Sequence, residues 1–162
     1  MADGAAVVDV MRIAGPADAK ARGATTGAPR RWLQLEGAML ALGALIAYQA
    51  IGAEWGLFAA VVLLPDLALI AYLAGPGAGA RAYNLSHAML LPGLLALVGW
   101  WGGHAIGWQL ALIWLVHIGV DRALGFGLKY PSGLRDTHLG RIGAGRLSDH
   151  ATMRHAPHPA DR

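Results

Sequence analysis

The sequence contains no cysteine, and few of its residues are charged. The absence of cysteine excludes disulfide bonds, thiolate metal sites and a cysteine nucleophile, and it leaves the redox compartment undetermined. Charged residues make up only 14% of the 162 residues, whereas hydrophobic residues make up 56%, and the mean hydropathy is +0.44. This apolar content is too high for an ordinary soluble domain of this size. We therefore interpret the chain as an integral membrane protein whose main partner is the lipid bilayer.

Four apolar blocks have the length of about twenty residues that crosses a hydrocarbon core. They cover residues 32–51, 55–73, 83–101 and 106–124. The segments between them are short, so consecutive helices must be antiparallel neighbours. One of these segments, "GPGAGAR" at residues 75–81, is interpreted as a tight turn, because it lacks the lysine of a phosphate-binding P-loop. The sequence predicts an all-α fold over residues 32–126, an up-down bundle of four transmembrane helices.

The remaining residues divide into two tails and one patterned segment. Residues 1–31 contain no apolar core long enough for a signal peptide and are interpreted as a flexible cytoplasmic tail, in which Met11 is an alternative start. Residues 127–143 are too polar to span a membrane and too patterned for a random tail. We expect them to fold back at the membrane interface and cap the bundle. Residues 144–162 are interpreted as a flexible basic tail.

The basic residues indicate how the chain is oriented. With four spans, all 13 Lys and Arg residues fall on one side of the membrane, and the turns on the other side carry only Glu54 as a charge. The positive-inside rule makes the basic side cytoplasmic, which predicts a protein of the inner membrane with both termini in the cytoplasm. The pI of 9.7 then reflects topology and attraction to anionic headgroups, and nucleic-acid binding is not expected.

Five ionisable residues lie at a similar predicted depth in the cytoplasmic half of the spans, at least one on each helix. They are Glu36, Asp66, His87, His117 and Asp121. His117 and Asp121 are four residues apart and share one helix face, as do Asn84 and His87, three residues apart. Ionisable side chains at membrane depth are costly unless they are paired or hydrated. The pattern predicts a shared polar site.

Three functions fit such a site. Asp66, His87, His117 and Asp121 suit a Zn²⁺, Fe²⁺ or Mn²⁺ ion, with Glu36 as general base in the metal-assisted hydrolysis of a lipid-like substrate. Alternatively, the cluster is interhelical hydrogen bonding in a non-catalytic bundle that packs against itself or partner proteins. The third alternative is a proton or ion relay, and a transport role would imply a homo-oligomer, because four spans are few for a lone transporter.

Three further polar residues belong to the predicted cytoplasmic side. Arg81, at the start of the third helix, would face lipid phosphates. Arg122 would extend towards the headgroups. His138 lies in the segment expected to cap the polar site.

Several stretches carry a resemblance to a known family. They are "LEG" at the start of the first span, "PDLALIAYLAGPGAGARAYNLSHAMLLP", "HIGVDRALGFGLKYP" and "DTHLGRIG". Over about residues 32–143 the chain resembles a family of small bacterial integral membrane proteins classed as a domain of unknown function. The resemblance implies a membrane location and four helices, and it implies no activity, substrate or cofactor.

Overall fold

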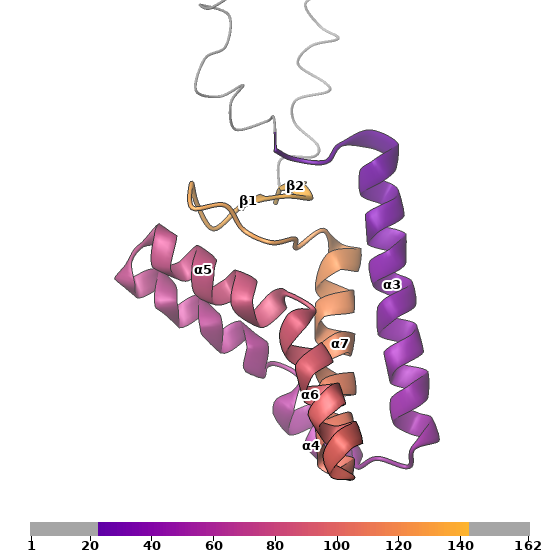
Figure 1. Ribbon diagram of the computed structural model, residues 1–162. Helices are drawn as coiled ribbons and strands as arrows, with labels where there is room; N and C mark the ends of the chain where they lie inside the picture. The colour runs from indigo at the N-terminus through magenta and orange to yellow at the C-terminus, as the bar shows by residue number, and fades with distance from the viewer. Residues whose placement is uncertain (1–22, 143–162) are drawn as a thin grey trace, which may run out of the picture.

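The computed structural model describes residues 23–142, which form a helical domain with one small hairpin (Figure 1). Its helices are α3 (Gly27–Ala50), α4 (Trp55–Val61), the 3₁₀ helix η1 (Leu64–Ala74), α5 (Pro76–His87), α6 (Leu90–Gly102) and α7 (Ala105–Leu124). The antiparallel strands β1 (Asp136–Thr137) and β2 (Gly140–Arg141) follow. The expected basic tail at 144–162 and most of the expected N-terminal tail, including Met11, lie outside the described residues. The last part of that predicted tail is helical, because α3 begins five residues before residue 32.

Three helical segments are long and apolar enough to cross a membrane: Gly27–Ala50, Trp55–Ala74 and Pro76–Gly102. The helix α7 has 20 residues but is not among them. Its C-terminal half carries His117, Asp121 and Arg122, which lower its apolar character, and many of its residues are buried. The all-helical architecture is confirmed for the described residues, and the fourth span stays a prediction.

The helix α3 has large apolar side chains on its outer face and small ones on its inner face. Exposed residues recur every three or four positions: Trp32, Leu35, Met39, Leu42 and Ile46. Its buried residues are Gly37, Ala44 and Tyr48. An exposed apolar stripe of this kind is unfavourable in water and is expected where a helix faces lipid.

The helices α3 and α7 lie side by side, and two glycines allow their backbones to approach closely (Figure 1). A Cβ atom at Gly37 would lie 2.9 Å from the carbonyl oxygen of Gly119, and one at Gly119 would lie 2.6 Å from the backbone nitrogen of Ala41. Small residues at such contacts let membrane helices pack through their backbones. This packing holds α7, which carries two of the predicted site residues, against the longest helix.

The second and third predicted spans are each broken into two helices, which the sequence analysis did not predict. The breaks fall between α4 and η1 and between α5 and α6, with Pro65 and Pro92 shortly after them. A proline lacks the N–H group and its ring clashes with the carbonyl group four residues earlier, so it interrupts an α-helix. As a result, η1 and α5 form a helical hairpin that leans away from α3 and α7 (Figure 1).

The interpretation of "GPGAGAR" as a tight turn was wrong for most of its length, because α5 begins at Pro76. Only Gly75 makes the turn, with a φ of 107° that favours glycine. The physical reason is close packing. A Cβ atom at Gly79 would lie 2.2 Å from the ring of Tyr72, so glycine here lets η1 and α5 come together.

Residues 127–142 fold into a compact segment that includes the β1–β2 hairpin. The hairpin pairs Asp136 with Arg141 and Thr137 with Gly140. The segment is tied to α5 by Asn84, whose side chain donates to the Lys129 carbonyl oxygen at 2.9 Å and accepts from the Lys129 backbone nitrogen at 2.6 Å. The segment therefore has a defined position relative to α5, and its place at a membrane interface stays a prediction.

Candidate metal centre

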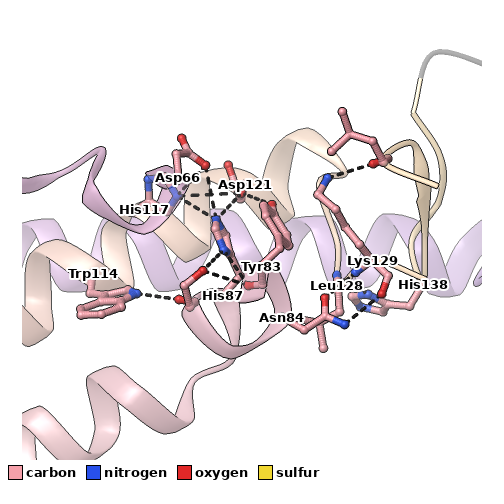
Figure 2. Close-up of polar contacts among 12 residues, drawn as sticks. Asp66, Tyr83, Asn84, His87, Trp114, His117, Asp121, Leu128, Lys129 and His138 are labelled. Carbon is pink, nitrogen blue, oxygen red and sulfur yellow. Dashed lines mark hydrogen bonds and ion pairs between the residues drawn. The ribbon is translucent and has the colours of Figure 1, made fainter. Parts of the chain in front are cut away.

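Four of the five ionisable residues singled out by depth meet where the broken helices pass α7. Asp66 lies near the start of η1, His87 is the last residue of α5, and His117 and Asp121 lie one turn apart on α7. Each offers one ligand atom, and the four atoms lie within 4.8 Å of one another. Figure 2 shows these side chains pointing towards a common centre.

The individual distances join nitrogen and oxygen atoms that can each present a lone pair to an ion. His87 Nε2 lies 3.1 Å from His117 Nε2, 3.3 Å from Asp121 Oδ2 and 3.5 Å from Asp66 Oδ1. His117 Nε2 lies 3.6 Å from Asp66 Oδ1 and 4.0 Å from Asp121 Oδ2. The imidazoles are 3% and 6% exposed for His87 and His117, whereas Asp66 is 40% exposed. The imidazoles thus form the buried side of the group and Asp66 its open side.

The surroundings of His87 determine which of its ring nitrogens carries hydrogen. Nδ1 lies 3.0 Å from the Tyr83 carbonyl oxygen and 2.8 Å from Ser86 Oγ. A carbonyl oxygen can only accept, so Nδ1 is the donor and Nε2 presents its lone pair to the other three residues. A backbone carbonyl bonded to the far nitrogen is the usual support of a metal-ligating histidine.

Such a group of lone pairs requires a positive charge or a shared proton at its centre. Two carboxylates and the His87 lone pair repel one another at these distances unless something stands between them. Zn–N and Zn–O distances of about 2.0–2.2 Å place the ligand atoms of a tetrahedral ion about 3.3–3.6 Å apart, close to most of the separations found here. The alternative is a hydrogen bond in which a protonated His117 Nε2 donates to His87 Nε2 across their 3.1 Å separation.

Other side chains hold the four residues in position. The Tyr83 hydroxyl donates to Asp121 Oδ2 at 2.7 Å, and the Tyr83 ring stacks on His87 with centroids 3.6 Å apart. Trp114 Nε1 donates to the Ser86 carbonyl oxygen at 2.7 Å, which ties α7 to the end of α5. These contacts fix the orientation of both a carboxylate and an imidazole.

The group opens onto a cavity of about 360 Å³. Asp66, Tyr83 and Asp121 line it together with Lys129 and Arg135 of the segment after α7. Lys129 is only 5% exposed, and Figure 2 shows its side chain beside Tyr83. Burial lowers the pKa of the Lys129 ammonium, and the carboxylates of Asp121 and Asp66 oppose that shift.

The remaining predicted site residues lie elsewhere. Glu36, Arg122 and His138 line a separate cavity of about 100 Å³ between α3, α7 and the following segment. Glu36 is therefore not part of the four-residue group, and its predicted role as general base has no support from its place. Arg81 is exposed on α5. His138 Nδ1 accepts a hydrogen bond from the Leu128 backbone nitrogen at 2.8 Å, and burial lowers its pKa.

Two residues of this site, Tyr83 and Lys129, were not predicted from the sequence. Tyr83 is four residues before His87 and therefore on the same helix face, a spacing that could have indicated it. Nothing in the sequence distinguishes Lys129 from a solvated lysine after a helix end, because its burial depends on how residues 127–142 fold.

A family model described as "Domain of unknown function (DUF4260)" matches residues 30–142. The match includes the four possible metal ligands and the two neighbouring residues Tyr83 and Lys129. No curated protein and no solved structure matches the chain.

Proposed function

Since the chain belongs to the DUF4260 family, whose description assigns no activity, we propose a function from the geometry of its own residues. The protein is a membrane-bound, divalent-metal-dependent hydrolase of a lipid-like substrate. The observation that carries this proposal is the convergence of Asp66, His87, His117 and Asp121 within 4.8 Å, beside a cavity of about 360 Å³.

The donor set favours Zn²⁺, Fe²⁺ or Mn²⁺, because imidazole and carboxylate ligands suit these ions. The buried imidazoles would hold the ion from behind, and the carboxylates would hold it at the cavity wall. When bound, the ion would supply an activated water and polarise an ester oxygen. Asp66 and Asp121 line the cavity, so a substrate that enters it would lie beside these two carboxylates.

Asp66 is the residue best placed to move protons. One of its carboxylate oxygens belongs to the group, and its partial exposure leaves the other free to accept the proton of the attacking water. The water oxygen would bond to the acyl carbon or phosphorus of the substrate while the bond to the alcohol oxygen breaks. Transfer of the proton from Asp66 to the departing alkoxide would complete the hydrolysis and restore the carboxylate.

The membrane is part of this proposal. Three helices could cross a bilayer, and the one-sided Lys and Arg residues favour the bacterial inner membrane with both termini in the cytoplasm. A substrate dissolved in that bilayer could reach the cavity without crossing bulk water. An ester of a lipid is the substrate class that fits this setting best.

The test is metal content and metal-dependent stability of the full chain in detergent. We expect about one ion per chain, and a melting temperature that falls after chelation and recovers with Zn²⁺, Mn²⁺ or Fe²⁺. Metal at one hundred times its Kd would stabilise the folded state by about 2.7 kcal/mol. His117→Gln and Asp121→Asn should lose the ion, whereas the control His104→Gln, in an exposed turn, should keep it.

Absence of stoichiometric metal, together with a melting temperature that no added ion changes, would contradict the metal centre. In that case, a decrease of about 1 kcal/mol in the stability of the His117→Gln protein would support interhelical hydrogen bonding. A normally folded His117→Gln protein that loses a pH-dependent activity would instead support a proton relay, because glutamine cannot take up a proton.

A further inference from the structure

The cavity beside the four-residue group is lined by side chains of opposite charge. Asp66 and Asp121 come from η1 and α7, and Lys129 and Arg135 come from the segment after α7. The rest of the lining is largely apolar: Leu69, Phe126, Leu134 and Ile142. A volume of about 360 Å³ is within the range of roughly 300–1,000 Å³ for small-molecule sites. The cavity can therefore hold a ligand with one charged and one apolar part.

Lys129 is positioned by the fold although, among residues 23–142, no carboxylate lies within ion-pair distance of its ammonium. Its backbone is held on both sides by Asn84. Its Nζ donates to the Leu134 carbonyl oxygen at 3.1 Å and lies 4.2 Å from the centroid of the Tyr83 ring. Within residues 23–142, no carboxylate forms an ion pair with it. A buried ammonium is costly without an anionic partner, so a ligand anion would stabilise this arrangement.

A count of charges around the cavity indicates which anion fits. A divalent ion in the group would neutralise Asp66 and Asp121, which leaves the charges of Lys129 and Arg135 unbalanced. A phosphate monoester carries a charge of about −1.5 to −2 at pH 7. Its three terminal oxygens can contact an ion, an ammonium and a guanidinium at the same time, whereas a carboxylate has only two oxygens.

We propose that this cavity binds a phosphate group, with Lys129 and Arg135 on one side of it and the ion held by Asp66, His87, His117 and Asp121 on the other. The apolar lining accommodates the acyl chains of a phosphorylated lipid. This inference rests on the proposed metal centre and names the charged part of its substrate. Lys129 is the residue that selects phosphate over an uncharged headgroup.

The test measures ligand binding to the full-length, metal-loaded and desalted protein in an uncharged detergent. The probes are dihexanoylphosphatidate, dihexanoylglycerol, which has the same chains without phosphate, and inorganic phosphate. We expect the glyceride to bind about tenfold or more weakly than the phosphatidate, since a hydrogen bond to a charged group is lost. Inorganic phosphate that binds as tightly as phosphatidate would identify free phosphate as the source of the group.

The variants assign the effect to Lys129. Lys129→Met should weaken phosphatidate binding about tenfold with metal content unchanged, and Lys129→Arg should restore most of it. The control Arg31→Gln removes an exposed cation of α3 outside the cavity and should bind like the unaltered protein. Arg135 is exposed, so Arg135→Gln provides a second cavity variant if Lys129→Met fails to fold.

The outcomes separate this inference from the proposed function. A protein that binds metal but binds phosphatidate and glyceride equally, or whose Lys129 and Arg135 variants bind like the unaltered chain, would overturn the phosphate site and leave the metal centre standing. A protein without metal that still binds phosphatidate through Lys129 would overturn the metal centre and support the phosphate site.

Discussion

The phenol of Tyr83 joins the two halves of the site. Its hydroxyl donates to Asp121, its ring stacks on His87, and the Lys129 ammonium lies over the same ring at 4.2 Å from the centroid. Removing a group that orients a metal ligand in this way typically lowers metal affinity by about 10–100-fold. We therefore expect Tyr83→Phe to lower metal affinity by about that factor, measured by competition with a chelator of known affinity.

Tyr72→Phe is the matched control for this substitution. The Tyr72 hydroxyl is buried and has no hydrogen-bond partner within residues 23–142, so its removal should leave metal affinity unchanged. If Tyr83→Phe and the unaltered protein had equal metal affinities, the hydrogen bond from Tyr83 would not be required to orient the Asp121 carboxylate.

At the scale of single residues, the sequence predicted which side chains meet better than it predicted the direction of each side chain. Asp66, His87, His117 and Asp121 were correctly expected to lie together, because similar depth on different helices limits where their side chains can meet. Glu36 has a similar predicted depth, but it lines a different cavity. The direction of a side chain around its helix axis depends on which neighbouring helix packs against that face. Next to Glu36, the buried residue Gly37 faces α7.

The contact between α3 and α7 depends on the absence of side chains. A Cβ atom at Gly119 would meet the backbone of α3 at 2.6 Å, and backbone cannot move aside as a flexible side chain can. We expect Gly119→Ala to separate the two helices and to cost about 1–3 kcal/mol of stability, as overpacking does. The measurement is thermal unfolding in detergent, followed by circular dichroism.

Gly43→Ala on α3 is the control, because nothing lies within 4 Å of a Cβ atom at that position. Alanine in a helix interior is favoured over glycine by about 0.5–1 kcal/mol, so this variant should be as stable as the unaltered protein or more so. A Gly119→Ala protein that is equally stable would contradict the close packing of these helices.

The lengths of the helical segments could be predicted from the apolar blocks, but their interruptions were missed. Pro65 and Pro92 stand in the printed sequence as signals for both breaks. The start of α5 could not be predicted in the same way. Four of the seven residues of "GPGAGAR" are glycine or proline, a composition typical of turns. The close packing of Tyr72 on Gly79 favours a helix there instead.

The molecule as a whole has two ends that differ in charge. In Figure 1 the start of α3 and the end of α7 lie at one end, and the turns after α3 and α6 lie at the other. We predict that reporter fusions at Arg30 and Arg81 read cytoplasmic, and that fusions at Glu54 and His104 read external. An external reading at Arg81 would mean that η1 and α5 do not complete their spans, and the orientation would need revision.

Asp66 and His87 come from the consecutive helices η1 and α5, and His117 and Asp121 come from α7, which follows later in the chain. An ion bound to all of them would act as a cross-link between these segments, in a protein that has no cysteine with which to form a covalent one. The broken spans and the leaning hairpin would then be fastened to α7 at a single point. Loading with metal would decide how firmly the whole helical domain is closed, and each ligand would contribute to assembly as well as to chemistry.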